Sequence, residues 1–503
     1  MMHLIIPKAK MQITSGLLKA IISPIIFLAG CGGNSTDSPS TAIETGATAT
    51  PPPTSAVTPT GQASRLQDSR IYTLDPTALP FGPMAGVAAE TDRWAGVLNG
   101  SGYRIEVPKR WNGRLVLYAH GYDGLEPVLK VSDVPIRRYL VENGYAWAAA
   151  SFSKNGYDVR AGVEDTNALA LAFTTIAAQN SRPLPAPSKI YIVGASMGGH
   201  VAAAAIERET LETANNKVRY NGALSMCGVV GDTDLFNYAT AYQLAAQYLG
   251  GLPATTFPVT DFAGKEERIK DALWRIFPLF PTDQGRKLSA AFISLTGGPR
   301  PIAEDSFKLK PFQDPVWRRF GDDGTIEGIL TKNIADTTGI AYQLDADPAL
   351  SPEEQTMNAT ILRVTSASDA NPRRTDGLRW VPKVNGQFDV PVVTLHSLGD
   401  LFVPFSMQQI YKRRALANGS DRWLIQRAIR SPGHCDFTIT EQVEAFQSMV
   451  TWEQFGTKPA GDDVLNPAVV ANANYGCSFT RNTTGPDDSG ALNAVRKILP
   501  SCP

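Results

Sequence analysis

One segment of this 503-residue chain combines a serine with closely spaced glycines, and these residue types could do chemistry. The segment Gly194-Ala195-Ser196-Met197-Gly198-Gly199 follows an apolar run at 189–193 and precedes a helix-like stretch. A serine on a sharp strand-to-helix turn has a strained backbone, and side chains two residues either side of it would collide, so glycine is needed there. The helix directs its amide end at the serine, which favours developing negative charge. We therefore predict that Ser196 is a nucleophile.

A nucleophilic serine needs a base, and the chain has five histidines from which to supply it. His3 lies in the N-terminal leader, His120 precedes a glycine in a loop, His200 falls just inside the helix after the serine, and His396 ends a strand. His434 stands on a loop between the last strand-like run and the final helix. We predict His434 as the base because the other four are worse placed, and we expect His396 to be structural or to support the site.

The acid that orients this base is predicted to be Asp400. It lies in the turn after an apolar strand, within Ser397-Leu398-Gly399-Asp400. Asp436 is a rival, but at two residues from His434 it is poorly placed to reach the ring nitrogen. The resulting chain order is Ser, Asp, His, which differs from the orders of chymotrypsin and subtilisin.

An oxyanion intermediate would need backbone donors near the serine. The N–H of Met197, the residue after the nucleophile, is one predicted donor. The second is expected from the loop after an early strand, Tyr118-Ala119-His120-Gly121-Tyr122, where glycine lets the chain turn towards the site. We predict the N–H of Tyr122, whose ring could also line the site.

Alternating strands and helices must position these residues. Apolar or alternating runs predict strands at 103–107, 114–119, 146–152, 189–193, 222–227, 390–396 and 423–429. Helical patterns cover 135–142, 165–179, 200–213 and 440–454. Mostly apolar strands between helices indicate an α/β fold with a mostly parallel sheet covered on both faces.

The alternation stops between residues 234 and 388, where helical patterns, prolines and aromatics replace buried strands. A segment this long is not a plain loop, so we predict a mainly helical cap over the carboxyl ends of the strands. The predicted organisation begins with a leader at 1–30 and a tether at 31–65. The first part of the core at 66–233 and the second part at 389–460 enclose the cap at 234–388, and a tail follows at 461–503.

The N-terminus predicts export and a lipid anchor. An apolar stretch at 20–28 is too short to span a bilayer comfortably and ends in Leu28-Ala29-Gly30-Cys31, which resembles a bacterial lipobox with Cys31 as the lipidated residue. Gly32 favours an outer-membrane destination in a Gram-negative host. The Ser/Thr/Pro-rich tether would join this anchor to the folded part. With 47 Lys plus Arg against 48 Asp plus Glu, the chain lacks the electrostatic footprint of a nucleic-acid-binding protein.

Lipidation of Cys31 would leave four cysteines: Cys227, Cys435, Cys477 and Cys502. In an oxidising compartment four cysteines can form two disulfides in three pairings. A Cys477–Cys502 bridge would staple the poorly apolar tail, and Cys227–Cys435 would then be the second bridge.

Together, the segments around His120, Ser196, Asp400 and His434 resemble those of the α/β-hydrolase superfamily over roughly residues 96–456. The resemblance implies acyl-enzyme chemistry without a cofactor or a metal, and it implies that the ends carrying Cys227 and Cys435 approach each other. A disulfide there would be similar in spirit to that of the tannase and feruloyl-esterase group. In that group a cysteine directly precedes the nucleophile, whereas Ala195 stands here, so the chain is not assigned to it.

The expected function is hydrolysis of a carboxylic ester from a small molecule or a polymer, and the large cap and its aromatics suggest an aromatic one. One alternative is a serine peptidase resembling the prolyl-oligopeptidase group, although no propeller-like run of short strands precedes the catalytic part. The other is a binding module that kept the fold without catalysis, although such proteins usually lose a member of the triad.

Overall fold

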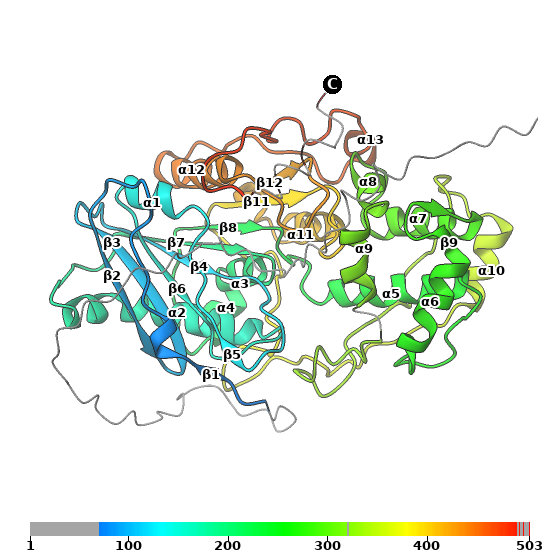
Figure 1. Cartoon of the computed structure of the whole chain (residues 1–503), viewed down its shortest axis with the longest axis horizontal. Coiled ribbons are helices and arrows are strands. Elements are labelled where there is room, and N and C mark those ends of the chain that lie inside the picture. Colours follow the sequence, from blue (N-terminus) through cyan, green and yellow to red (C-terminus); the bar gives the residue numbers. More distant parts are fainter. Residues whose placement is uncertain (1–69, 319–320, 490–491, 493–495, 497–501, 503) are drawn as a thin grey trace, which may run out of the picture.

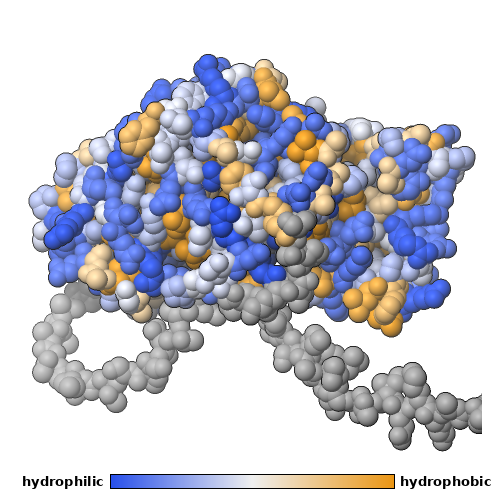
Figure 2. All heavy atoms as spheres, turned by 90° about the horizontal axis from the view of Figure 1, so that it is seen from above, coloured by the Kyte–Doolittle hydropathy of each residue, from blue (hydrophilic) through white to orange (hydrophobic). Residues whose placement is uncertain are grey.

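The computed structural model describes residues 70–318, 321–489, 492, 496 and 502. The predicted leader, the tether and the lipidation site Cys31 lie outside the described residues. Within the described part of the chain, no helix combines the length and apolar character needed to cross a membrane. Hydrophilic residues predominate on the face shown in Figure 2, with hydrophobic residues scattered among them.

An eight-stranded sheet organises the described chain, in the order β12-β11-β8-β7-β4-β6-β3-β2 (Figure 1). Its strands are β2 (Thr91–Leu98), β3 (Ser101–Pro108), β4 (Arg114–Ala119), β6 (Ala146–Ala150), β7 (Lys189–Ala195), β8 (Gly222–Met226), β11 (Val392–Ser397) and β12 (Leu424–Ile429). The pairs from β12 to β6 are parallel, and β3 and β2 add an antiparallel edge. A separate parallel pair joins β1 (Thr73–Leu74) to β5 (Val128–Leu129).

Both faces of the sheet are buried, as the apolar strands predict. Leu115 and Leu117 of β4 belong to the core cluster with residues of α2 and α3, while Val116 and Tyr118 belong to the cluster with residues of α1 and α12. The bounds of these helices are α1 (Arg137–Glu142), α2 (Val159–Gln179), α3 (Met197–Ala205) and α12 (Ile439–Phe455). Because successive strand residues point to opposite faces, two helical layers enclose the sheet.

The remaining helices of this part are α4 (Arg208–Thr213), α11 (Ser406–Ala417), α13 (Pro467–Val470) and the 3-10 turns η1 (Pro76–Ala78) and η2 (Asp421–Trp423). The helix predicted at 200–213 is wrong as one element, because the chain breaks between α3 and α4. Glu207 lies at the break with extended backbone, and its buried carboxylate accepts the N–H groups of Gly386 and Gln387. Strand β2 and helix α11 were not predicted.

Between β8 and β11 the chain forms a mainly helical lobe beside the sheet (Figure 1). Its elements are α5 (Asp234–Leu249), α6 (Phe262–Leu273), β9 (Trp274–Ile276), β10 (Phe280–Pro281), α7 (Asp283–Leu295), α8 (Ala303–Phe307), α9 (Lys310–Trp317) and α10 (Pro352–Thr360). Buried aromatic rings, including Trp274, Phe292, Phe307 and Trp317, pack together within it. The exact bounds of the cap remain a prediction.

The two ends of this lobe are tied together at one buried carboxylate. Asp232, just before α5, is fully buried and accepts hydrogen bonds from the Val384 N–H at 3.0 Å and the Lys383 ammonium at 3.1 Å. Arg414 of α11 donates to it at 2.7 Å. The chain therefore leaves and rejoins the sheet domain at neighbouring points.

Candidate active site

The turn that carries Ser196 has the strand-turn-helix form predicted from the sequence. Strand β7 ends at Ala195, α3 begins at Met197, and Ser196 between them has a left-handed φ of 58°. A Cβ on Gly194 would lie 1.9 Å from the carbonyl oxygen of Gly198, and a Cβ on Gly198 would lie 1.9 Å from that of Ala119. Both glycines are therefore required by close backbone approach.

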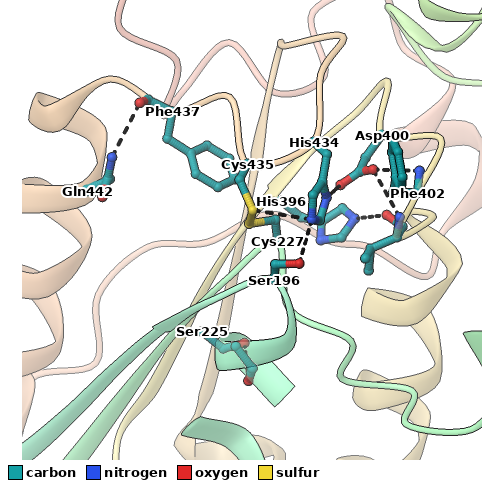
Figure 3. The surroundings of a disulfide bond; sticks show 12 residues. Ser196, Ser225, Cys227, His396, Asp400, Phe402, His434, Cys435, Phe437 and Gln442 are labelled. Atoms are coloured by element: carbon teal, nitrogen blue, oxygen red, sulfur yellow. Dashed lines mark hydrogen bonds and ion pairs between the residues drawn. A yellow bond between two sulfur atoms is a disulfide. The ribbon is translucent and has the colours of Figure 1, made fainter. Parts of the chain in front are cut away.

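Three residues far apart in the sequence form a continuous hydrogen-bonded relay (Figure 3). His434 Nε2 lies 2.7 Å from Ser196 Oγ, and His434 Nδ1 lies 2.6 Å from Asp400 Oδ2. A carboxylate accepts from an Nδ1–H, so the other ring nitrogen is free to accept the serine hydroxyl. The three residues follow β7, β11 and β12, in the order Ser, Asp, His.

This topology and turn geometry decide the fold. The chain has the α/β-hydrolase fold. Ser196, the predicted nucleophile, lies in the turn after β7, at the carboxyl edge of the parallel strands. Asp400 and His434, the predicted acid and base, follow β11 and β12, two neighbouring strands at one side of the sheet. The α/β-hydrolase core thereby brings loops 238 residues apart within hydrogen-bonding distance of each other.

Comparisons with known proteins found distant similarities. No family model matches the chain. The curated o-phthalyl amidase of Xanthobacter agilis is 23% identical over 442 residues, covering 77% of this chain and 93% of that protein. Among solved structures, feruloyl esterase B from Aspergillus oryzae is 13% identical with a TM-score of 0.37, covering 76% of this chain and 86% of that one. For Candida antarctica lipase A the identity is 14%, the TM-score 0.33 and the coverage 79% and 80%. The strand order and the turn geometry of the chain itself define its α/β-hydrolase fold.

The predicted acid, Asp400, is buried and hydrogen-bonded to the backbone. Asp400 has no exposed surface, and its Oδ1 accepts the N–H groups of Phe402 at 2.9 Å and Val403 at 3.0 Å. The remaining oxygen, Oδ2, is the one that faces His434. With one oxygen held by two backbone donors, the carboxylate has a fixed direction towards the imidazole, as an orienting acid requires.

A disulfide adjoins the imidazole (Figure 3). Cys227, directly after β8, is bonded to Cys435, with Cα atoms 5.2 Å apart. Cys435 Sγ lies 3.5 Å from His434 Nε2. Cys227 and Cys435 both have left-handed backbone, with φ of 45° and 55°. Cys227, His434 and Cys435 are the one group of possible metal ligands found among the described residues, and the bond between the two sulfurs makes it unsuitable for a metal.

The second disulfide joins Cys477 to Cys502 in the tail. Of the three pairings that four cysteines allow, the structure therefore contains Cys227–Cys435 with Cys477–Cys502, as predicted. Tail residues also pack beneath the base loop, since the Thr480 hydroxyl accepts the Arg430 N–H at 2.9 Å.

The other described histidines are engaged elsewhere. His200 lies 2.9 Å from the Tyr157 hydroxyl and 2.8 Å from the Pro382 carbonyl oxygen, and burial lowers its pKa to about 4. His396 lies 2.9 Å from the Val403 carbonyl oxygen, and burial lowers its pKa to about 4 as well. Burial also lowers the pKa of His120, whose ring stacks on Phe152. These three rings are buried and hydrogen-bonded in the scaffold.

The rival acid does not reach the imidazole. The carboxylate of Asp436 accepts the hydroxyl of Ser431 instead. Burial raises the pKa of Asp436 to about 6. The structure thus brings Asp400, and not Asp436, to His434.

The loop expected to supply the second oxyanion donor lies beside the nucleophile. A Cβ on Gly121 would be 3.2 Å from Ser196 Cβ. The neighbouring Tyr122 donates its hydroxyl hydrogen bond to Glu327, which belongs to the helical lobe. The donor roles of Tyr122 N–H and Met197 N–H remain predictions. Met197 directly follows Ser196, and Tyr122 directly follows Gly121, which lies beside Ser196.

Sequence reasoning missed several side chains around the relay. The Phe402 ring lies 5.6 Å from the His434 ring, centroid to centroid. Arg300 and Tyr238 of the helical lobe hydrogen-bond to carbonyl oxygens beside Asp400. Proximity to Asp400 in the chain could have pointed to Phe402, whereas no local pattern marks the other two.

Proposed function

We propose that this chain is a serine hydrolase that cleaves carboxylic esters through an acyl-enzyme intermediate. The observation that carries the proposal is the relay from Asp400 through His434 to Ser196, with contacts of 2.6 and 2.7 Å. In the first half-reaction, Ser196 Oγ attacks the ester carbonyl while His434 Nε2 takes the hydroxyl proton. The tetrahedral intermediate collapses, and the imidazolium gives that proton to the departing alkoxide, leaving Ser196 acylated.

The second half-reaction repeats these steps with water as the nucleophile. His434 Nε2 removes a proton from the attacking water, and the acyl–Oγ bond then breaks as the proton returns to Ser196. Asp400 holds the ring and stabilises its charged form throughout. Oxyanion stabilisation is proposed to come from the N–H groups of Met197 and Tyr122, at the start of α3 and in the loop after β4.

Amide hydrolysis is the second candidate. It is supported by the similarity to the o-phthalyl amidase over 93% of that protein's length. The same relay can cleave an amide, because the imidazolium can protonate a departing amine before the bond breaks. The two candidates differ in the leaving group and share the acyl-enzyme.

The test uses the full-length protein beside its Ser196→Ala variant. Both are treated with a fluorophosphonate probe and with p-nitrophenyl esters and p-nitroanilides carrying the same short, long and aromatic acyl groups. We expect probe labelling and ester turnover in the wild type and neither in the variant. Faster turnover of the anilides would favour the amidase, and a folded wild type that neither labels nor turns over any substrate would refute both.

We also propose that the enzyme is exported and attached to the cell envelope by lipid on Cys31. The two disulfides support an oxidising compartment, where such bonds persist. In a bacterial host, wild-type protein is expected in the detergent-rich phase on Triton X-114 partitioning and the Cys31→Ser variant in the aqueous phase. Equal partitioning of the two would contradict lipidation at this residue.

A further inference from the structure

The loop that carries Asp400 is held from both sides by the helical lobe. Arg300, between α7 and α8, donates from Nε to the carbonyl oxygen of Leu398 at 2.7 Å. Tyr238 of α5 donates its hydroxyl to the carbonyl oxygen of Leu401 at 2.9 Å. These two carbonyls stand two residues before and one residue after Asp400. Two distant segments of the lobe thus fix the backbone around the acid.

The contact between the lobe and this loop is close-packed. A Cβ on Gly399 would lie 1.8 Å from the hydroxyl oxygen of Ser306 in α8, so only glycine fits against that helix. On its other side the loop is paired with the base segment, since the N–H of Gly399 donates to the carbonyl oxygen of Ser431 at 2.9 Å. A displacement of the lobe would therefore move the acid relative to the base.

Arg300 also brings a buried positive charge to this place. It is only 7% exposed, and its other hydrogen bonds go to neutral oxygens, the Gly298 carbonyl at 2.9 Å and the Thr296 hydroxyl at 3.0 Å. Burial lowers its pKa to about 10, while the nearby Asp400 acts in the opposite direction. A buried guanidinium is costly unless a countercharge compensates it, and Asp400 is the carboxylate whose field it feels.

We propose that Arg300 is a positioning residue for catalysis, which acts through Asp400 by holding the backbone of the loop that carries it. The inference rests on the proposed function, since it assigns Asp400 as the orienting acid. The helical lobe is then a structural part of the catalytic centre as well as a candidate cover for it.

The test compares Arg300→Met, which removes the charge, with Arg300→Lys, which keeps it but loses the planar fork. Arg363→Met is the matched control, because Arg363 also binds backbone carbonyls in the lobe, those of Thr337 at 3.0 Å and Ile340 at 2.6 Å, without touching the acid loop. The readouts are kcat, KM and the rate of Ser196 labelling by a fluorophosphonate. Labelling does not depend on the natural substrate, so it can be measured even if the natural substrate is not an ester.

We expect Arg300→Met to lower kcat and the rate of Ser196 labelling at least tenfold with little change in KM, because the acid loop loses its hydrogen bond from Arg300. Arg300→Lys should recover part of both rates, and Arg363→Met should leave both unchanged. A folded Arg300→Met protein with wild-type kcat and labelling rate would overturn the proposal.

A second variant protects the test against misfolding of Arg300→Met. Tyr238→Phe removes only the hydroxyl bonded to the Leu401 carbonyl and leaves the packing of the ring. It should lower kcat severalfold with little change in KM, since the acid loop loses one of its hydrogen bonds from the lobe. Unchanged kcat in both Tyr238→Phe and Arg300→Met would show that the lobe does not position the acid. If the fluorophosphonate does not label Ser196 of the folded wild type, the proposed function itself is refuted.

Discussion

Removing the bridge between Cys227 and Cys435 should weaken both the fold and the catalytic geometry. The bond spans 208 residues, and in the chain-entropy model closure of such a loop contributes about 5 kcal/mol to the free energy of unfolding. It also fixes the residue next to His434, so its loss frees the imidazole to leave Ser196. A misplacement of about 1 Å can cost roughly 100-fold in rate. We expect Cys227→Ala with Cys435→Ala to lose several kcal/mol of stability and at least tenfold in kcat.

The tail bridge supplies the matched control. Cys477–Cys502 spans only 25 residues, for which the same model gives about 3.5 kcal/mol. Its double alanine variant should therefore lose less stability and keep kcat. Urea unfolding followed by circular dichroism, with no reductant present, gives the free energies. Turnover at 25 °C, where both variants are folded, gives the rates.

Two results would refute this reasoning. If the Cys227/Cys435 variant keeps wild-type kcat, the bridge does not hold His434 in place. If the two double variants lose the same stability, loop length does not determine the contribution of these bonds.

Three further predictions follow from the site and its scaffold. Asp400→Asn should retain the fold, since an amide oxygen can still accept the two backbone N–H groups, but kcat should fall about 10⁴-fold; a fall of less than tenfold in steady-state kinetics would contradict the assigned role. Gly198→Ala should give no soluble protein that the fluorophosphonate labels, because its Cβ would lie 1.9 Å from the Ala119 carbonyl oxygen. The control Gly339→Ala meets nothing within 4 Å, so its yield and labelling should equal those of the wild type. Burial lowers the pKa of His396 from 6.5 to about 4, so between these values the unfolded chain binds a proton that the folded chain does not, and stability falls as pH drops. The free energy of unfolding of the wild type should therefore fall between pH 7 and 4.5 by about 2 kcal/mol more than that of His396→Gln. Urea titrations of both proteins at the two pH values measure this difference, and an equal fall in both would count against the prediction.

The parts of the fold that local patterns determine were predictable. Strand β4 has the bounds predicted from its apolar run, and α12 differs from its prediction by one residue at each end. The sequence also singled out the three residues that the structure joins by hydrogen bonds, because each has a distinctive neighbourhood: glycines around Ser196, and turns after strands for Asp400 and His434. Their catalytic roles stay predictions.

What could not be predicted depends on contacts between distant segments. The break at Glu207 arises because its carboxylate binds backbone near residue 386, and nothing in the 200–213 pattern records that partner. Strand β2 alternates weakly and is defined by its pairing with β3. Arg300 and Tyr238 are ordinary residues of a helical region, and their relation to Asp400 exists only in three dimensions.

The bridge from Cys227 to Cys435 also decides what happens when the chain is cut. Every residue of the helical lobe lies between its two ends, so a protease that hydrolyses one peptide bond there leaves two fragments still joined through sulfur. Such a nicked molecule keeps Ser196 on one fragment and Asp400 and His434 on the other. The two fragments then lose their covalent link when the disulfide is reduced.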